Sequence, residues 1–596
     1  MSHYSKKLSI IIAIITILSS FAYIAIAAPK ELKIEIKIDK NSPIQKKLLE
    51  LVKEMEQTAK IYKTTNQKSY WENEGKKSFY KLLRSEGYYA SIIDVEIPSN
   101  QSNSIIFHIS LSQRYTISKI SITHIDYSNK NIKTPNIDDL KIKSGQFAIA
   151  EKILNAEKTL LNYIENNNCL LSITVSHAAI INHLDNKIEI SFLINAGPSA
   201  TIEKVDFTGL KRVKSTYVHK LVGLENGQCF RQSYITKARG ALQKSSLFAS
   251  TTPTIPVATN KDGSVPVIFN LTERKPRSLK AGIGYGTDLG LGASLGWEHR
   301  NFFGSGEKME ADLFGNQKEQ ILELNYIEPF YKRNDQTLKL GAKAENRKSK
   351  AFASKEGTIS GLLERKLTKK WTAGGGVRFS QSKIKETGKG KSKTFSLLST
   401  PLYIVHDTRN NILDPKKGFE FKFGGAPYFN VRSKEKPFFK TYIFGSTYFS
   451  LQTKLKPVLA IRASTGSILG LDSVKVPHTE RFYVGGSNSL RGYAYQLAGK
   501  LDENKRPLGG RSFVETAIEL RLKITDQIGI VGFLDSGLSY ISTQPDIKQK
   551  LLHGAGFGVR YLTDFGPIRA DIAFPLKRRK FIDKSYQLYF GIGQAF

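Results

Sequence analysis

Arg491 is the residue of this sequence best suited to a specific ionic interaction. It stands in the stretch YVGGSNSLRGYAY, residues 483–495, beside Gly492 and Tyr493. The glycine, serine and asparagine residues of this stretch are typical of a solvent-exposed loop. A guanidinium, however, presents a planar fork of donors that can bridge two carboxylates through charge-assisted hydrogen bonds. Arg491 is therefore either a solvated charge or the centre of a fixed ion cluster.

Three acidic residues after this stretch are candidate partners. In FVETAIELRLK, residues 513–523, Glu515 and Glu519 share the parity opposite to the apolar residues, so both carboxylates face one side of a strand. Asp535 lies in the next segment, GFLDSGLSY, where apolar residues occupy both parities. If the long segment 472–510 folds back toward these strands, Arg491 can bridge two carboxylates on adjacent strands, with Glu515, Glu519 and Asp535 as the candidates. The alternative is a disordered outer loop, since long loops are usually functional or disordered.

Catalytic and cofactor motifs are not found. The sequence has no Gly-x-Ser-x-Gly, no paired His/Cys spacing and no Walker loop, and GIGYGTDLGLG, residues 282–292, fails the dinucleotide spacing. We therefore expect no enzyme, no metal site and no cofactor.

The charge of the chain predicts an anionic neighbour. Its 596 residues carry 89 Lys+Arg against 53 Asp+Glu, a formal net charge of +36, which suits nucleic acid or a phosphate-bearing membrane surface. Lys6 and Lys7, the apolar run Leu8–Leu18 and the small residues of Ala25–Ala27 predict a secretory signal peptide over residues 1–27. An uncleaved membrane anchor is the alternative. Export favours a cell-envelope role and argues against nucleic acid.

The order strand, helix, helix, strand, strand occurs three times before residue 276. We assign the three copies to residues 28–112, 113–198 and 199–275. After them the helical pattern ends, and residues 276–596 alternate apolar with polar residues in short segments rich in Gly, Tyr and Phe. Charges on one face of a strand and aromatic residues on the other are typical of a transmembrane β-barrel with a polar lumen. At about 20 residues per strand and loop, this region predicts about 16 strands.

The first and last barrel strands carry glycines on one face. We expect these strands to close the barrel and, because glycine weakens a strand, to form a seam that can open sideways. Alternatively, the small residues make room for the folded-back loop. The seam glycines are Gly282, Gly284, Gly286, Gly591 and Gly593.

Cys169 and Cys229 are the two cysteines of the chain, and they fall in neighbouring repeats. A disulfide between them is compatible with an exported protein. The sequence leaves the bonded and the free alternatives open, because bonding requires Cα atoms within reach of each other.

Several segments resemble the BamA/TamA superfamily of outer-membrane barrels, in which periplasmic POTRA modules precede a 16-stranded barrel. GGSNSLRGY is similar to the arginine-glycine-aromatic motif of the sixth extracellular loop, and GGRSFVETAIEL and GFLDSGLSY are similar to two carboxylate-bearing strands. VHDTRNNILDPKKGFEF also resembles a family segment. The resemblance implies that Arg491 contacts Glu519 and Asp535 inside the barrel, that Phe596 belongs to a C-terminal assembly signal, and that the loop motif consists of Gly485, Gly486, Leu490, Arg491, Gly492 and Tyr493.

The resemblance also implies partners. Three modules rather than five favour the TamA branch, which implies a TamB-like protein that spans the periplasm, unfolded outer-membrane proteins such as autotransporters as clients, and contact with outer-membrane lipid and lipopolysaccharide. No nucleic acid is expected. The alternatives are a BamA-type general insertase, a two-partner secretion pore and a passive channel or receptor. For Phe596, a lipid-facing aromatic residue is the other interpretation.

Overall fold

The computed structural model describes residues 32–39, 42–61, 67–98, 104–125, 132–388, 391–451, 453, 455–546, 548–563, 566–592 and 594. The predicted signal peptide lies outside these residues. The chain forms two compact units, one of Met1–Asp206, Leu224–Lys237 and Thr254–Val267, the other of Phe207–Gly223, Ala238–Pro253 and Ile268–Phe596. The third predicted module is therefore divided between the units.

Three small sheets with flanking helices precede the barrel. In each sheet the strand that comes third in the sequence lies at the centre, between the first and the second. The strand orders are β1-β3-β2, β4-β6-β5 and β7-β9-β8. The elements are β1 (Lys33–Lys37), α2 (Gln45–Ile61), α3 (Lys68–Ser85), β2 (Ile92–Glu96), β3 (Ser104–Ser110), β4 (Thr116–His124), η1 (Ile137–Leu140), α4 (Ala150–Asn167), β5 (Ile173–Asn182), β6 (Lys187–Ala196), β7 (Thr201–Thr208), α5 (Ser215–Val222), α6 (Gln232–Lys244), β8 (Phe248–Thr254) and β9 (Ser264–Glu273).

Each helix buries one stripe of side chains against its sheet. In α3 the buried residues recur every four positions, at Trp71, Gly75, Phe79 and Leu83, as one face of a helix requires. Gly87 follows the end of α3 with φ +92°, a left-handed conformation that favours glycine after a helix.

The first predicted helix of the second module is only the short 3-10 helix η1. The predicted order of strand, helix, helix, strand, strand led us to expect an α-helix at this position. In the structure Lys141 takes φ +57° and Ile142 is fully buried, so the chain turns to place this side chain in the core instead of continuing the helix.

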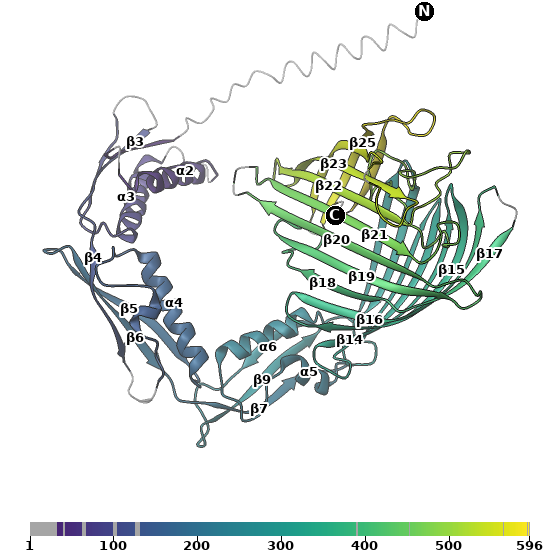
Figure 1. The fold of residues 1–596 in the computed structure, drawn as a ribbon. Coiled ribbons are helices and arrows are strands. Elements are labelled where there is room, and N and C mark those ends of the chain that lie inside the picture. Colours follow the sequence, from purple (N-terminus) through teal and green to yellow (C-terminus); the bar gives the residue numbers. More distant parts are fainter. Residues whose placement is uncertain are drawn as a thin grey trace, which may run out of the picture. The chain divides into compact units, whose positions relative to one another are not determined.

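The second unit contains a closed barrel (Figure 1). Its strands are β10 (Arg277–Gly286), β11 (Gly290–His299), β12 (Lys308–Asn316), β13 (Glu319–Pro329), β14 (Gln336–Lys348), β15 (Phe352–Lys366), β16 (Trp371–Glu386), β17 (Ser392–Ser399), β18 (Leu402–Asp407), β19 (Gly418–Asn430), β20 (Phe438–Ser450), β21 (Val458–Leu469), β22 (Ser512–Lys523), β23 (Ile528–Tyr540), β24 (Leu552–Thr563), β25 (Gly566–Pro575) and β26 (Gln587–Ile592).

β17 and β18 are two halves of one barrel position. Both pair with β16 on one side and with β19 on the other. Pro401 lies between them, and proline has no N–H to donate to a ladder. The seventeen segments therefore occupy sixteen positions, so the prediction of a 16-stranded antiparallel barrel preceded by α/β modules is confirmed.

The barrel strands point apolar side chains outward and polar side chains inward. Leu279 and Ile283 of β10 are 83% and 74% exposed on the outer face, whereas Glu519 of β22 is fully buried inside. This is the pattern expected of a barrel in lipid with a polar lumen. Among the described residues, none of the helices combines the length and the apolar content needed to cross a bilayer.

An acidic residue fixes the end of the third module, just before the barrel begins in the sequence. Glu273, the last residue of β9, accepts hydrogen bonds from the backbone N–H groups of Lys211, Arg212 and Val213 at 2.8–2.9 Å. Burial raises the pKa of Glu273, but these N–H groups and the charge of Arg212 outweigh burial and hold the pKa below its ordinary value.

The end of the barrel at which β10 begins is called the base below, and the opposite end is called the top.

Candidate functional site

The segment between β21 and β22, residues 470–511, turns into the barrel. Its motif residues Leu490, Arg491 and Tyr493 are 0%, 2% and 0% exposed. Leu490 and Tyr493 pack with Val484 of the same segment and with Phe513 of β22. Val484, Leu490, Tyr493 and the buried guanidinium therefore show that residues 470–511 are a folded segment, called the plug below, rather than a solvated loop.

Arg491 bridges Glu519 and Asp535, the two carboxylates that the family resemblance implied. Its Nε and Nη2 atoms donate to the two oxygens of Asp535, both at 2.7 Å, and Nη1 donates to Glu519 Oε1 at 2.7 Å. Its backbone N–H also donates to Asp535, at 3.1 Å. Its guanidinium carbon lies 3.5 Å from the centre of the Phe533 ring. This geometry uses the whole fork of the guanidinium, which an ammonium group could not reproduce.

Further charged residues extend the cluster on the lumen wall. Arg521 donates to Glu519 Oε2 through Nε and Nη2, at 3.0 and 2.9 Å. Asp571 of β25 lies 3.7 Å from Arg491 Nη1 and pairs with Arg560 of β24. Sequence reasoning did not assign Arg521, Arg560 or Asp571 to the site, although the inward parity of Arg521 and Asp571 was a usable signal.

The glycines of the motif permit its sharp path. Gly485 and Gly486 have φ +116° and +110°, and Gly492 has φ +92°, conformations that side chains with a Cβ rarely adopt. A Cβ on Gly492 would lie 2.9 Å from the backbone of Phe574, so glycine is also needed for close approach. Glycine at these positions lets the plug lie directly against β25.

Glu515 and Arg462 hold the tip of the plug. Glu515, one of the two carboxylates with inward parity, accepts a hydrogen bond from Ser489 Oγ instead of pairing with Arg491. Arg462 of β21 donates to the backbone carbonyls of Asn488 and Ser489, both at 2.8 Å. The tip is therefore fixed from two neighbouring strands.

The seam between β10 and β26 is short. Among the described residues, the two strands pair only at Tyr285–Phe590 and Gly286–Tyr589. On its other side, β10 pairs with β11 over its whole length, from Arg277–His299 to Gly286–Gly290. Thr287 adds one backbone hydrogen bond to Leu588, at 3.0 Å. The paired part of the seam lies at the top, and the lower part of β10 has no described partner on this side.

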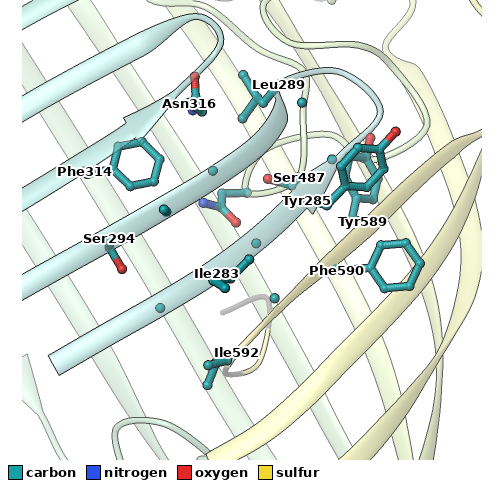
Figure 2. Close-up of a pocket in the computed structure, with 18 of the residues that line it drawn as sticks. Ile283, Tyr285, Leu289, Ser294, Phe314, Asn316, Ser487, Tyr589, Phe590 and Ile592 are labelled. Atoms are coloured by element: carbon teal, nitrogen blue, oxygen red, sulfur yellow. The ribbon is translucent and has the colours of Figure 1, made fainter.

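A pocket of about 450 Å³ lies at the seam (Figure 2). Figure 2 shows Tyr285 of β10 near Tyr589 and Phe590 of β26, with Ser487 of the plug also at the pocket wall. Gly282, Gly284, Gly286 and Gly591 line this pocket. The plug also contacts the last strand directly, since the Gly492 N–H donates to the hydroxyl of Tyr589 at 3.4 Å.

The remaining predicted residues are placed as follows. Cys169 and Cys229 form a disulfide whose Cα atoms are 5.1 Å apart, and it links the second and third modules. The segments around it are also bonded through their backbones, because the Ala200 N–H donates to the carbonyl of Cys169 at 2.9 Å. Gly593 and Phe596 lie outside the described residues.

Two family models match this chain. Residues 301–596 match the Omp85 superfamily domain, and residues 200–274 match POTRA, the surface antigen variable number repeat. The chain belongs to the Omp85 superfamily. Proteins of this superfamily are outer-membrane barrels with periplasmic POTRA domains, so the base of this Omp85 barrel faces the periplasm and its top faces the cell exterior.

Two curated relatives are similar to this chain over part of their length. Outer membrane protein assembly factor BamA of Nitratidesulfovibrio vulgaris is 23% identical over 534 residues, which are 86% of this chain and 66% of that protein. Outer envelope protein 80 of Arabidopsis thaliana chloroplasts is 25% identical over 356 residues, 54% of this chain and 46% of that protein. The Omp85 chain thus covers less than two thirds of the length of either relative.

Solved structures share the fold. BamA from Haemophilus ducreyi lacking POTRA domains 1–3 superposes with a TM-score of 0.64 at 20% identity and covers 80% of this chain and 100% of that chain. CdiB from Acinetobacter baumannii superposes with a TM-score of 0.52 at 13% identity and covers 80% of this chain and 89% of that chain. At these identities the likeness concerns the fold alone.

Proposed function

We propose that this protein is a general insertase of the BamA type, which assists the insertion of other β-barrel proteins into the outer membrane. The observation that carries the proposal is the short seam, at which β10 pairs with β26 only through Tyr285 and Gly286 in the described part of the chain. The name of the BamA relative supports the same function.

The seam offers an edge for a client strand. Below Tyr285, the N–H and C=O groups of β10 that point away from β11 have no described strand partner. An unpaired strand edge is a template for strand addition, in which backbone hydrogen bonds provide affinity. An unfolded client strand could pair with this edge and enter the membrane sideways.

The glycines of the seam fit this role. Because glycine loses more backbone entropy and packs no side chain, it weakens strand pairing where it lines the seam. The alternative, in which small residues only make room for the plug, predicts close packing against them. Instead, Gly282, Gly284 and Gly286 border the pocket of about 450 Å³.

The partners in this proposal are unfolded outer-membrane proteins together with outer-membrane lipid and lipopolysaccharide. We expect neither nucleic-acid binding nor enzymatic activity. The role of the Arg491 cluster is positional, because it holds the plug against the strands that lead to the seam.

A covalent lock across the seam tests the proposal. Tyr285→Cys and Phe590→Cys, introduced together, place a cysteine pair at directly paired positions. The protein in liposomes is assayed for its effect on the folding rate of a small outer-membrane barrel protein diluted from urea. We expect oxidation to abolish the acceleration and reduction to restore it.

The matched control is the pair Leu295→Cys and Leu313→Cys. These residues are paired between β11 and β12 and lie on the same outer face, 59% and 51% exposed. Oxidation of this pair should leave the acceleration intact. Full activity of the oxidised seam pair would refute an insertase that works by opening this seam.

A TamA-type component is the second candidate. The three module sheets of the described residues favour it, and it would work with a TamB-like protein that spans the periplasm. Affinity capture of the full chain from cell envelopes distinguishes the two: recovery of a long periplasm-spanning protein supports the TamA type, and its absence supports a general insertase. A passive channel would show high open conductance in the wild type that does not change in Arg491→Ala.

A further inference from the structure

The turn between β18 and β19, residues 408–417, reaches across the base of the barrel. It joins the eighth and ninth of the sixteen strand positions, which lie opposite the seam in the order of strands. Even so, Asp414 Oδ1 accepts a hydrogen bond from Gln594 Nε2 at 3.0 Å, just beyond the end of β26. The Gln594 N–H also points to the carbonyl of Leu413, at 3.5 Å.

This turn has a fixed shape. Asn410 Oδ1 accepts hydrogen bonds from the N–H groups of Lys416 and Lys417, at 2.9 and 3.1 Å. Asn411 Oδ1 accepts from the N–H groups of Leu413 and Asp414, at 2.8 and 3.0 Å. Two side-chain caps of this kind stabilise a turn against the flexibility of an ordinary loop.

The turn is also anchored at its two sides. On the side of its own strands, Arg409 Nη2 donates to Asp407 and Glu420, at 2.8 and 2.9 Å. On the far side, Pro415 is buried, and its carbonyl accepts a hydrogen bond from Arg521 Nη1 at 3.4 Å. The turn is thus a strap fastened to both sides of the lumen.

Gln594 is held at both ends of its amide group. Its NH₂ donates to Asp414, while its Oε1 accepts from Arg560 Nε at 3.0 Å. Arg560 pairs in turn with Asp571, which lies 3.7 Å from Arg491. The strap, Gln594 and the arginine of the plug are therefore parts of one polar network.

The lower part of β26 has few other contacts with neighbouring strands. Gly591 and Ile592 pair with Arg569 and Ile568 of β25, but within the described residues they do not pair with β10. The position of this end of β26 therefore depends on β25, on Arg560 of β24 and on the strap.

We infer that the β18–β19 turn is a strap that positions the base end of β26, with Asp414 as the positioning residue, so that breaking the Asp414–Gln594 bond favours the open seam. The inference rests on the proposed function, since it describes what holds the seam closed. A hydrogen bond to a charged acceptor is strong enough to shift a two-state equilibrium about tenfold.

Distance measurements between spin labels test this inference. Leu279→Cys on β10 and Ile592→Cys on β26 are both exposed on the outer face, and both native cysteines are bonded, so only the introduced thiols react. Electron spin resonance then gives the distribution of label distances in the full-length protein in lipid nanodiscs. We expect Asp414→Ala to raise the ratio of long to short distances about tenfold.

Two controls separate positioning from general damage. Asp414→Asn keeps a neutral oxygen that accepts the hydrogen bond from Gln594, so it should lengthen the label distances less than Asp414→Ala does. Asp526→Ala removes an acid at the base that pairs only with nearby Lys523, among the described ion pairs, and should leave the distribution unchanged. Retention of the compact, heat-modifiable band on gels shows that each variant is folded.

A second pair of variants covers the case in which Asp414→Ala does not fold. Gln594→Glu sets a carboxylate against Asp414 and should lengthen the label distances, whereas adding Asp414→Asn to it should restore them. Unchanged distances in Gln594→Glu, or in folded Asp414→Ala, would overturn the inference. If the label distances lengthen in these variants but the client protein still folds in liposomes at the wild-type rate, the inference about the strap is supported and the proposed insertase function is contradicted.

Discussion

Replacement of Arg491 by lysine separates the shape of the side chain from its charge. The guanidinium makes three side-chain hydrogen bonds, two to Asp535 and one to Glu519, and also packs on Phe533. A lysine ammonium cannot bind both oxygens of Asp535 and reach Glu519 with the same geometry. At least one of the three bonds is therefore lost in Arg491→Lys, together with the planar contact with Phe533.

The expected cost follows from the burial of the cluster. Hydrogen bonds to charged groups contribute about 1.5–3 kcal/mol each, and breaking a buried ion pair costs about 3–5 kcal/mol. Glu519 and Asp535 are both fully buried, so water cannot replace the lost donors. We expect Arg491→Lys to lower the free energy of unfolding by about 3–5 kcal/mol, nearly as much as Arg491→Ala.

Urea unfolding of the barrel in detergent measures this difference. Trp297 and Trp371 lie on barrel strands, so tryptophan fluorescence follows their environment, and gel mobility confirms the folded form. Arg432→Lys, at an exposed arginine in the turn after β19, is the matched control and should behave as wild type. A wild-type unfolding curve for Arg491→Lys would refute the argument that the fork is required.

Three further predictions concern other parts of the molecule. Asp571→Ala leaves the paired guanidinium of Arg560 buried without its carboxylate and should destabilise the barrel by about 3–5 kcal/mol in the same urea assay. The pKa of Glu273 is held below its ordinary value of 4.5. The stabilisation of the third module by Glu273 is therefore fully present above pH 4.5 and is lost as the pH falls through the lower pKa of the folded state. Thermal unfolding measured against pH should show this loss of stability, and Glu273→Gln should abolish this pH dependence. Cys169→Ser with Cys229→Ser opens a loop of sequence separation 60 and should destabilise the modules by about 4 kcal/mol, measured by urea unfolding with and without reductant.

Strand parity made much of the barrel and part of the site predictable. Glu519 alternates cleanly with Ile518 and Leu520, so its inward position follows from the period of a strand, and the structure has it there. Strand parity did not determine the face of Asp535, because the apolar residues Val531 and Phe533 share its parity. In the structure these apolar residues face inward, and Phe533 packs against the Arg491 guanidinium, a contact that strand parity does not reveal.

Other features depend on contacts between segments far apart in the sequence. The break at Pro401 leaves β17 and β18 in one barrel position because both pair with β16 and with β19, and the local sequence pattern does not contain these pairings. The bond between Asp414 and Gln594 joins positions 180 residues apart, and neither residue has a local pattern that predicts it. Periodicity thus gives the face of a residue, whereas its partner across the lumen requires the closed barrel.

Cross-linking of a client to the edge of β10 tests the opening of the seam most directly. A photoreactive residue is placed at Ile283 of β10, 74% exposed, or at Leu313 of β12, 51% exposed and paired on both sides of its strand. During insertion of an unfolded outer-membrane protein into liposomes, we expect client adducts at Ile283 and none at Leu313. Equal adducts at the two positions, or none at Ile283 while insertion proceeds, would contradict the account.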